Sequence, residues 1–234
     1  MNTTNSVLRH RGPHPGIVAI VYTILFNAGL YQVISFTGGP HFPGPWELSE
    51  TIASYFQAHP KAVMVCAFLQ FGAAIPLGIF TATMVSRLRF FGVRAAGPSI
   101  ALFGGVMTAV NMAVSALLLW VMVYPGIAQE TAVLRALYYL VFAIGGVGFS
   151  VPMGLLIAGL SVPASIMKLL PKWLVVLGFA LGIVGELSAL NLIIPQALFL
   201  IPLTRFPAFV WLIAAGFALP ASPGVARQSN ERTA

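Results

Sequence analysis

One acidic residue, Glu186, lies near the middle of a long apolar stretch of the sequence. A charged side chain at the bilayer centre costs about 2.5–3.5 kcal/mol on insertion scales, so it must be neutralised, paired or hydrated. Two interpretations are open: a carboxyl that carries a proton or binds a cation, and a protonated or paired carboxyl that only ties helices together. Arg205 is the expected partner, because both residues reach similar depth if the chain turns near Pro195. If residues 197–204 instead lie at the interface, Arg205 is near water.

Four uncharged polar residues extend this candidate site. Asn27 and Tyr31 are four residues apart in one apolar stretch, and Asn111 and Ser115 are four apart in another. In a helix this spacing puts each pair on one face. With Glu186 and Arg205 they predict a small polar cavity near the middle of the membrane. The alternative is ordinary hydrogen bonding between helices, which is worth about 0.6 kcal/mol on average.

Two prolines, Pro76 and Pro152, fall inside apolar stretches, where each removes a backbone hydrogen bond and is expected to kink its helix. The kinks are candidate hinges or walls of a site, although static helix bundles contain them too. A shift of 76 positions places residues 72–78 on residues 148–154, both with the pattern Gly-x-x-x-Pro-x-Gly. This match is open to two interpretations, an internal duplication and chance.

Several kinds of chemistry are disfavoured by what the sequence lacks. The four histidines, His10, His14, His41 and His59, fall outside the apolar stretches, which argues against a transmembrane haem held by two histidines. No Lys lies mid-stretch to carry retinal, and there is no Asp and only one cysteine, Cys66. We therefore predict no cofactor and no metal site. Since no nucleophile accompanies Glu186, an intramembrane enzyme is the least favoured function.

The composition explains why these polar residues are so conspicuous. Hydrophobic residues make up 59% of the 234 residues and charged residues only 7%, against about 25% charged in soluble domains. Spanning a bilayer takes about 20 mostly apolar residues. The sequence predicts an all-α membrane bundle with six such segments: Ile17–Phe36, Ala62–Val85, Pro98–Met122, Thr131–Leu160, Lys172–Ile194 and Gln196–Leu219. The fourth is long and expected to be tilted, and Pro202 and Pro207 make a break in the sixth plausible.

The positive charges set the expected orientation. Although the net charge is +7, the basic residues are few and lie near helix ends, so they indicate orientation in the membrane rather than nucleic-acid binding. Both termini are predicted to be cytoplasmic because most basic residues then share one side: Arg9, Arg11, Arg87, Arg89, Arg94, Lys168, Lys172, Arg227 and Arg232.

The loop of residues 37–60 falls on the outer side in this topology. Pro45 and Glu47 are typical of a helix start. A short helix lying on the outer membrane surface is expected, with an apolar face made of Trp46, Leu48, Ile52, Tyr55 and Phe56. Residues 1–221 are predicted to form a single domain, and residues 222–234 a disordered cytoplasmic tail.

The chain resembles small six-helix bacterial membrane proteins that are grouped only as domains of unknown function. The resemblance rests on the helix with Asn27, the helix with Pro76 and Gly78, and the closing Arg205–Gly216 stretch. It implies a bacterial inner membrane and no established activity. The first functional hypothesis is binding or transport of a small apolar or amphipathic ligand, or of a proton. The second is an accessory or sensing subunit that contacts membrane lipids and partner proteins.

Overall fold

The computed structural model describes residues 10–34 and 41–222, and every regular element in these residues is a helix. Six segments are long and apolar enough to cross a membrane, which confirms the prediction of an integral membrane protein with six candidate spans. The elements are α1 (Pro15–Val33), α2 (Ser49–Ala58), α3 (Pro60–Phe90), α4 (Gly97–Met122), α5 (Thr131–Gly145), α6 (Val147–Ile166), α7 (Lys172–Leu187), the short 3-10 helices η1 (Ser188–Leu192) and η2 (Pro195–Phe199), and α8 (Leu200–Ala218).

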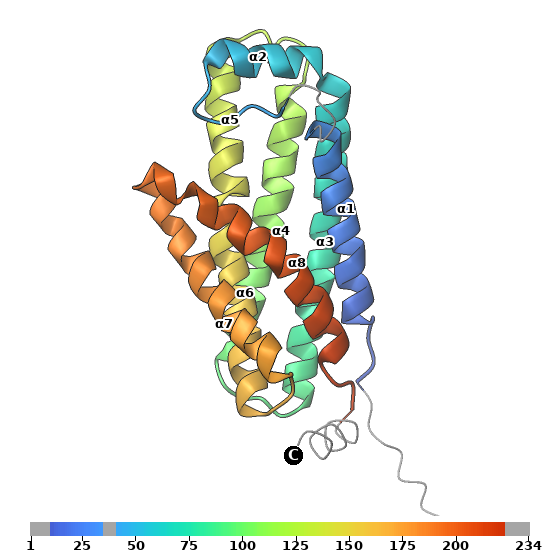
Figure 1. Ribbon diagram of the computed structural model, residues 1–234. Coiled ribbons are helices and arrows are strands. Elements are labelled where there is room, and N and C mark those ends of the chain that lie inside the picture. Colours follow the sequence, from blue (N-terminus) through green and yellow to red (C-terminus); the bar gives the residue numbers. More distant parts are fainter. Residues whose placement is uncertain (1–9, 35–40, 223–234) are drawn as a thin grey trace, which may run out of the picture.

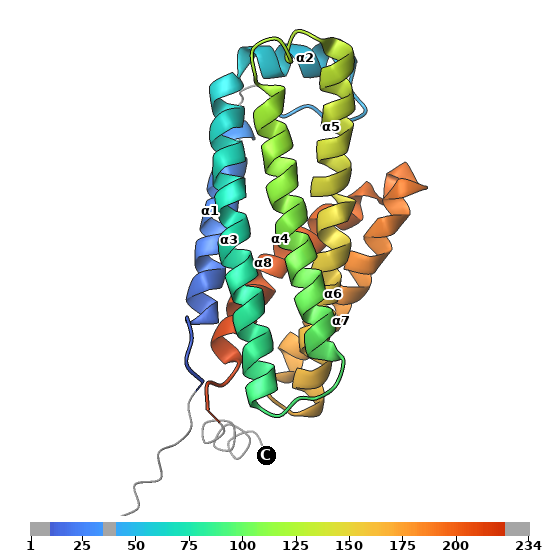
Figure 2. The same ribbon diagram turned by 180° about the vertical axis from the view of Figure 1, so that it is seen from behind.

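The helices form two regions of unequal height (Figure 1). Helices α1, α3, α4 and α5 stand side by side, and α2 lies across their upper end. Helix α6 continues downward from α5, and the α7–α8 hairpin leans against the lower part of the bundle, with its tip well below α2. Figure 2 shows the opposite face, where the antiparallel helices α3 and α4 lie side by side with the hairpin behind them.

The fourth predicted span is two helices rather than one. The predicted single segment Thr131–Leu160 is interrupted at Gly146, whose φ of −90° and ψ of −94° lie outside the helical region. A Cβ atom at this position would collide with the Phe142 carbonyl oxygen, so glycine is required. The helix is therefore interrupted where a long, tilted helix was expected.

The helices are continuous through their internal prolines. The kinks expected at Pro76 and Pro152 stay predictions. Helix α3 continues through Pro76, and α6 continues through Pro152. Helix α8 begins at Leu200 and contains Pro207 without a break, and the irregular backbone lies before it, in η1 and η2. The sixth span therefore begins in η2, and its main part, α8, is regular where its prolines suggested a break.

The helix between the first two spans begins at Ser49 rather than at Pro45. Ile52 and Phe56 are buried against the bundle, whereas Trp46 is exposed. The Tyr55 hydroxyl donates a hydrogen bond to the Val33 carbonyl oxygen at 3.0 Å and so ties α2 to the end of α1. Part of the apolar face expected on the membrane is therefore covered by protein.

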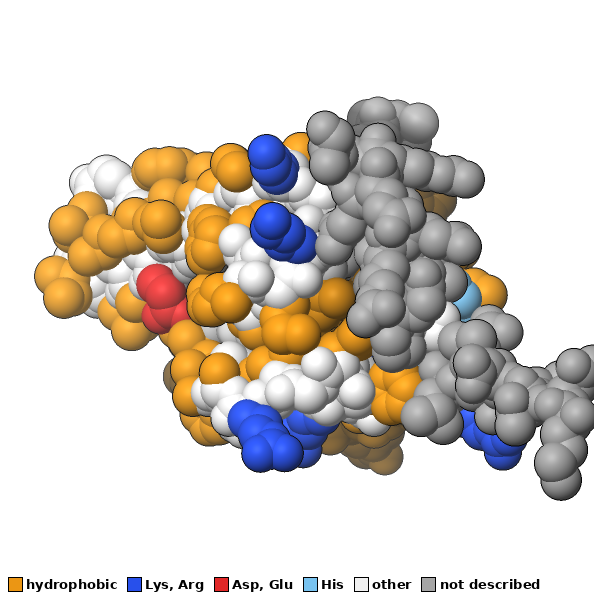
Figure 3. Space-filling view, turned by 90° about the horizontal axis from the view of Figure 1, so that it is seen from below, with side chains coloured by type: hydrophobic (Ala, Val, Ile, Leu, Met, Phe, Trp, Pro, Cys, Tyr) orange, Lys and Arg blue, Asp and Glu red, His pale blue; other side chains and the backbone are white. Residues whose placement is uncertain are grey.

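Charged residues gather at the two ends of the bundle. Figure 3 views the lower end of Figure 1, where Lys and Arg side chains are scattered among hydrophobic ones. This end brings together Arg11, Arg89, Arg94, Lys168 and Lys172, all exposed, because α3 and α6 end there and α4 and α7 begin there. The cytoplasmic location of this end remains a prediction. Arg9, and the predicted tail beyond Ser222 with Arg227 and Arg232, lie outside the described residues.

Candidate functional site

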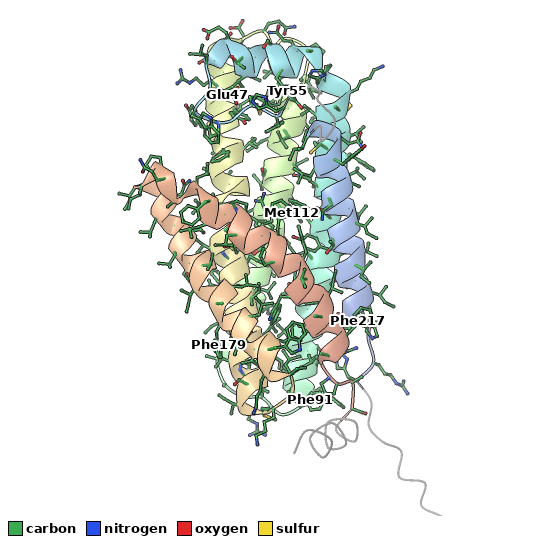
Figure 4. All side chains as sticks on the ribbon, in the orientation of Figure 1. Glu47, Tyr55, Phe91, Met112, Phe179 and Phe217 are labelled. Carbon is green, nitrogen blue, oxygen red and sulfur yellow. The ribbon has the colours of Figure 1, made fainter. Side chains whose placement is uncertain are left out.

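A cavity of about 210 Å³ lies between the four-helix region and α8. Its walls come from α1, α3, α4, α5 and α8, and from the junction of α5 and α6. Figure 4 labels one lining residue, Met112, near the middle of the bundle behind α8. The polar groups among mostly apolar lining side chains are Gln70, Ser115 and Arg205, with the thiol of Cys66. The break at Gly146 therefore lies in the wall of a mostly apolar cavity that contains a few polar groups.

Arg205 reaches this cavity from the second turn of α8. Its guanidinium Nη2 donates a hydrogen bond to the carbonyl oxygen of Gly145, the last residue of α5. A helix end leaves carbonyl groups without helical partners, and a cation stabilises the negative end of the helix dipole. The guanidinium carbon is also 4.5 Å from the centre of the Phe149 ring and 5.4 Å from that of Phe26, distances that fit cation–π contacts. The broken helix thus provides the acceptor that holds Arg205 inside the bundle.

The guanidinium retains unused hydrogen-bonding capacity. Its Nε atom is buried and has no hydrogen-bond partner within the described part of the chain. The ion pair found among the described residues joins His41 to Glu47, in the segment before α2. No described acidic residue therefore pairs with Arg205. An arginine carries five N–H donors in a fixed planar arrangement, which suits a carboxylate or phosphate.

The predicted pairing of Arg205 with Glu186 is absent from the described structure. Glu186 lies on an exposed side of α7 and does not line the cavity. Arg205 turns inward because the carbonyl oxygen of Gly145 lies on the inner side of α8. Glu186 and Arg205 are therefore apart, although they lie at similar distances along the chain from the turn near Pro195.

Asn111 and Ser115 both face the α5–α6 segment, one on each side of its break. The Asn111 side-chain amide donates a hydrogen bond to the Gly148 carbonyl oxygen at the start of α6. The Ser115 hydroxyl donates to the Val141 carbonyl oxygen in α5, at 3.2 Å. Ser115 also lines the cavity. The face of α4 predicted from sequence is therefore an inner face.

Asn27 and Tyr31 do not belong to the cavity lining. The Asn27 amide donates to the Thr23 carbonyl oxygen of its own helix at 2.8 Å, and Tyr31 is 64% exposed. The inner face of α1 is instead formed by aromatic and aliphatic residues such as Phe26 and Leu30. Of the six predicted site residues, the structure brings Arg205 and Ser115 to the cavity and Asn111 next to it.

Phe149, which stacks on Arg205, was not among the predicted site residues. Nor was the glycine-rich junction of α5 and α6 beside it. The available signal was the run Gly145-Gly146-Val147-Gly148, in which three residues of four are poor helix formers. Among the described residues, no group of three or more His, Cys, Asp or Glu side chains could hold a metal ion.

Comparison of the chain with protein-family models, with curated proteins and with solved structures found no match. The resemblance to six-helix bacterial membrane proteins therefore stays a prediction, and a function has to be argued from the geometry of the cavity.

Proposed function

We propose that this membrane protein binds a small amphipathic ligand with a negatively charged end in the cavity beside α8, and that Arg205 contacts the charge. The observation that carries the proposal is a buried guanidinium edge that lines an apolar cavity and lacks an acidic partner among the described residues. An Arg in a membrane span is expensive and usually marks a functional site.

The chemistry of the walls supports this class of ligand. Phe26, Leu30 and Phe149 offer hydrocarbon surface, while the amide of Gln70 and the hydroxyl of Ser115 provide a few polar contacts. Binding pockets typically combine an apolar lining with a small number of placed polar groups. A negative charge near Arg205 is also attracted more strongly in a low-dielectric interior than in water.

The size of the cavity limits the ligand. A volume of about 210 Å³ is below the roughly 300–1,000 Å³ of pockets for drug-sized molecules. It fits a short-chain carboxylate, or the charged end of a longer amphiphile. Glu186 has no part in this site. On the resemblance seen in the sequence, we also place the protein in a bacterial inner membrane.

The test compares two ligands with the same number of carbon atoms, one ending in a charged carboxylate and the other in a neutral hydroxyl group. Binding of radiolabelled decanoate and decanol is measured on the protein in lipid nanodiscs, with empty nanodiscs subtracted. Decanoate is expected to bind the protein, and Arg205→Gln should weaken it at least tenfold, because hydrogen bonds to charged groups are worth about 1.5–3 kcal/mol. Decanol binding should be unaffected by this substitution.

The matched control is Arg135→Gln, which removes an exposed arginine of α5 that contacts the Tyr139 hydroxyl. Decanoate binding should be unchanged in this variant. Equal affinity for decanoate in the protein and in Arg205→Gln would overturn the proposal, as would a substitution effect equal for decanoate and decanol.

The outward position of Glu186 favours a second function, as a subunit of a membrane complex. A carboxyl group on the lipid-facing side of a span is stabilised when another protein supplies a partner.

A further inference from the structure

Helix α7 has two contrasting faces. Its inner face is built from Gly178, Gly182 and Gly185, all buried. Their spacing of four and three residues puts them on one side of the helix. A Cβ atom added at Gly185 would lie 2.7 Å from the Cα atom of Gly154, so the backbones of α6 and α7 are almost in contact. Such close approach of small residues is typical of packed membrane helices, and it fixes the rotation of α7 about its axis.

The outer face of α7 consists of Val176, Phe179, Ile183, Glu186 and Leu187, all exposed, and the exposed Leu190 continues this face into η1. Val176 is 67% exposed and Ile183 is 61% exposed. Figure 4 labels Phe179 on the side of α7 that points away from the bundle. The outer face is therefore an apolar surface that contains one carboxyl group.

The position of Glu186 along its candidate span indicates a depth within the hydrocarbon core of the bilayer. Glu186 is 13 residues beyond Trp173, which is about 20 Å along a helix at 1.5 Å per residue. The hydrocarbon core of a bilayer is about 30 Å thick. Beyond Glu186 the tip of the hairpin is mostly apolar, with Ile193 83% exposed, and it also carries the amides of Asn191 and Gln196. The tip ends well short of α2 (Figure 1). No hydrogen bond or ion pair joins the carboxyl group to another described residue.

We propose that the outer face of α7 docks a transmembrane helix of another protein, and that this helix carries a Lys or Arg side chain at the depth of Glu186. An opposite charge offsets the cost of a carboxylate in hydrocarbon, because the attraction is strong in a low dielectric. The apolar residues on both sides of Glu186 supply the packing surface along which the partner helix lies.

A second copy of this chain does not fit the surface. In a two-fold dimer the same face of each copy meets, so Glu186 would face Glu186 and the like charges would repel. The chain also lacks an exposed cation at this depth within its described spans. Arg205 is turned into the bundle, and the remaining basic residues lie near span ends: Lys61, Arg87, Arg89, Arg135 and Lys172. Charge complementarity therefore points to a different chain.

The experiment uses a synthetic partner of defined chemistry. The protein, labelled at its lower end, is reconstituted in liposomes with a labelled 23-residue Leu–Ala peptide that has Arg at its centre, or with the same peptide with a central Leu. Energy transfer reports association. We expect the Arg peptide to associate about tenfold more strongly than the Leu peptide, and Glu186→Gln to abolish the difference.

Two further variants make the result specific. Glu130→Gln removes an exposed carboxyl just before α5 and should leave the tenfold preference unchanged. Glu186→Lys should transfer the preference to a peptide with a central Glu, a reversal that a folding defect cannot produce. Equal association of the Arg and Leu peptides with the unaltered protein would overturn the proposal. So would energy transfer between copies of the protein that is lost in Glu186→Gln, because the occupant would then be a second copy.

Discussion

Arg205 and Glu186 lie on the two helices of one hairpin, and their surroundings are opposite. The guanidinium of Arg205 bonds the carbonyl oxygen of Gly145 and contacts the rings of Phe26 and Phe149. The carboxyl of Glu186 is exposed on the outer side of α7 and has no such contacts among the described residues. The inner charge is thus stabilised by its own chain, and the outer charge is not.

The difference follows from where the backbone can offer partners. An intact membrane helix uses its carbonyl groups internally, so it has few to offer a charged side chain. The break at Gly146 releases carbonyl groups at the end of α5, and Arg205 is directed toward them. On α7 the glycine face occupies the inner side, so Glu186, about 100° further round the helix than Gly185, is directed outward. The charge of Arg205 is therefore stabilised by a broken helix of its own chain. The charge of Glu186 can be stabilised only by groups outside the chain.

The largest effect is expected from moving α7 off its glycine face. Gly185→Val should lower the free energy of unfolding by about 3 kcal/mol, because the new side chain meets the backbone of α6, and overpacking typically costs about 1–3 kcal/mol. The matched control is Gly78→Val, since no atom lies within 4 Å of where a Cβ atom on Gly78 would be. Denaturant titration in detergent micelles, followed by circular dichroism, compares the two. Equal losses would show that the glycine face does not fix α7.

Removal of each charge should have opposite effects on the free energy of unfolding. Arg205→Met should lower the free energy of unfolding of the isolated protein by about 2 kcal/mol, because the carbonyl oxygen of Gly145 loses a charged donor. Glu186→Met should leave it unchanged or raise it, because no partner is lost and an exposed carboxyl is removed from the span. The same titration measures both. An Arg205→Met variant as stable as the unaltered protein would contradict the comparison.

The six spans could be predicted because spanning depends on the length and apolar composition of a segment, which the sequence states directly. The interruption at Gly146 could not be found in this way, because glycine hardly changes the hydropathy of an apolar run. Pro152 drew attention instead, yet α6 continues through it. A proline removes one hydrogen bond, and neighbouring helices in a bundle compensate for this loss.

The sequence predicts how far the candidate site residues lie along their helices, but not the direction in which their side chains point. Counting residues from the turn near Pro195 gives the distance of Glu186 and Arg205 along their helices. It does not give the rotation of each helix about its axis when apolar residues cover all sides. The spacing of Gly178, Gly182 and Gly185 contains that information for α7, because small residues mark the side on which helices approach closely. Polar spacing gives the rotation only where another helix lies within reach. Asn111 and Ser115 on α4 bond the α5–α6 segment, whereas the same spacing on α1 leaves Tyr31 exposed.

A smaller effect is expected where Asn111 supports the same break from the side of α4. Asn111→Leu removes the hydrogen bond to the Gly148 carbonyl oxygen and should lower the free energy of unfolding by about 1 kcal/mol, since such bonds in membranes average about 0.6 and reach about 1.7 kcal/mol. Asn27→Leu is the matched control, because its amide bonds the carbonyl oxygen of its own helix. A double variant of Asn111 and Arg205 should lose less than the sum if both hold one junction, because either single change already loosens it. Strictly additive losses would argue that the two residues act separately.

The smallest effect concerns Glu47, a carboxylate outside the spans whose partners are in its own chain. The Gly44 backbone N–H donates to its Oε1 atom at 2.6 Å and the His41 Nε2 atom lies 2.9 Å from it, and these contacts lower the pKa of Glu47. A lowered pKa means that the contribution to stability is present above the ordinary carboxyl value of about 4.3 and is lost as the pH falls through the lowered value. The difference in melting temperature between the protein and Glu47→Gln should therefore shrink between about pH 5 and pH 2. If the difference in melting temperature instead grew on acidification, the contacts from Gly44 and His41 would not stabilise the ionised form of Glu47. The contrast with Glu186 would then have a cause other than the presence of hydrogen-bond donors.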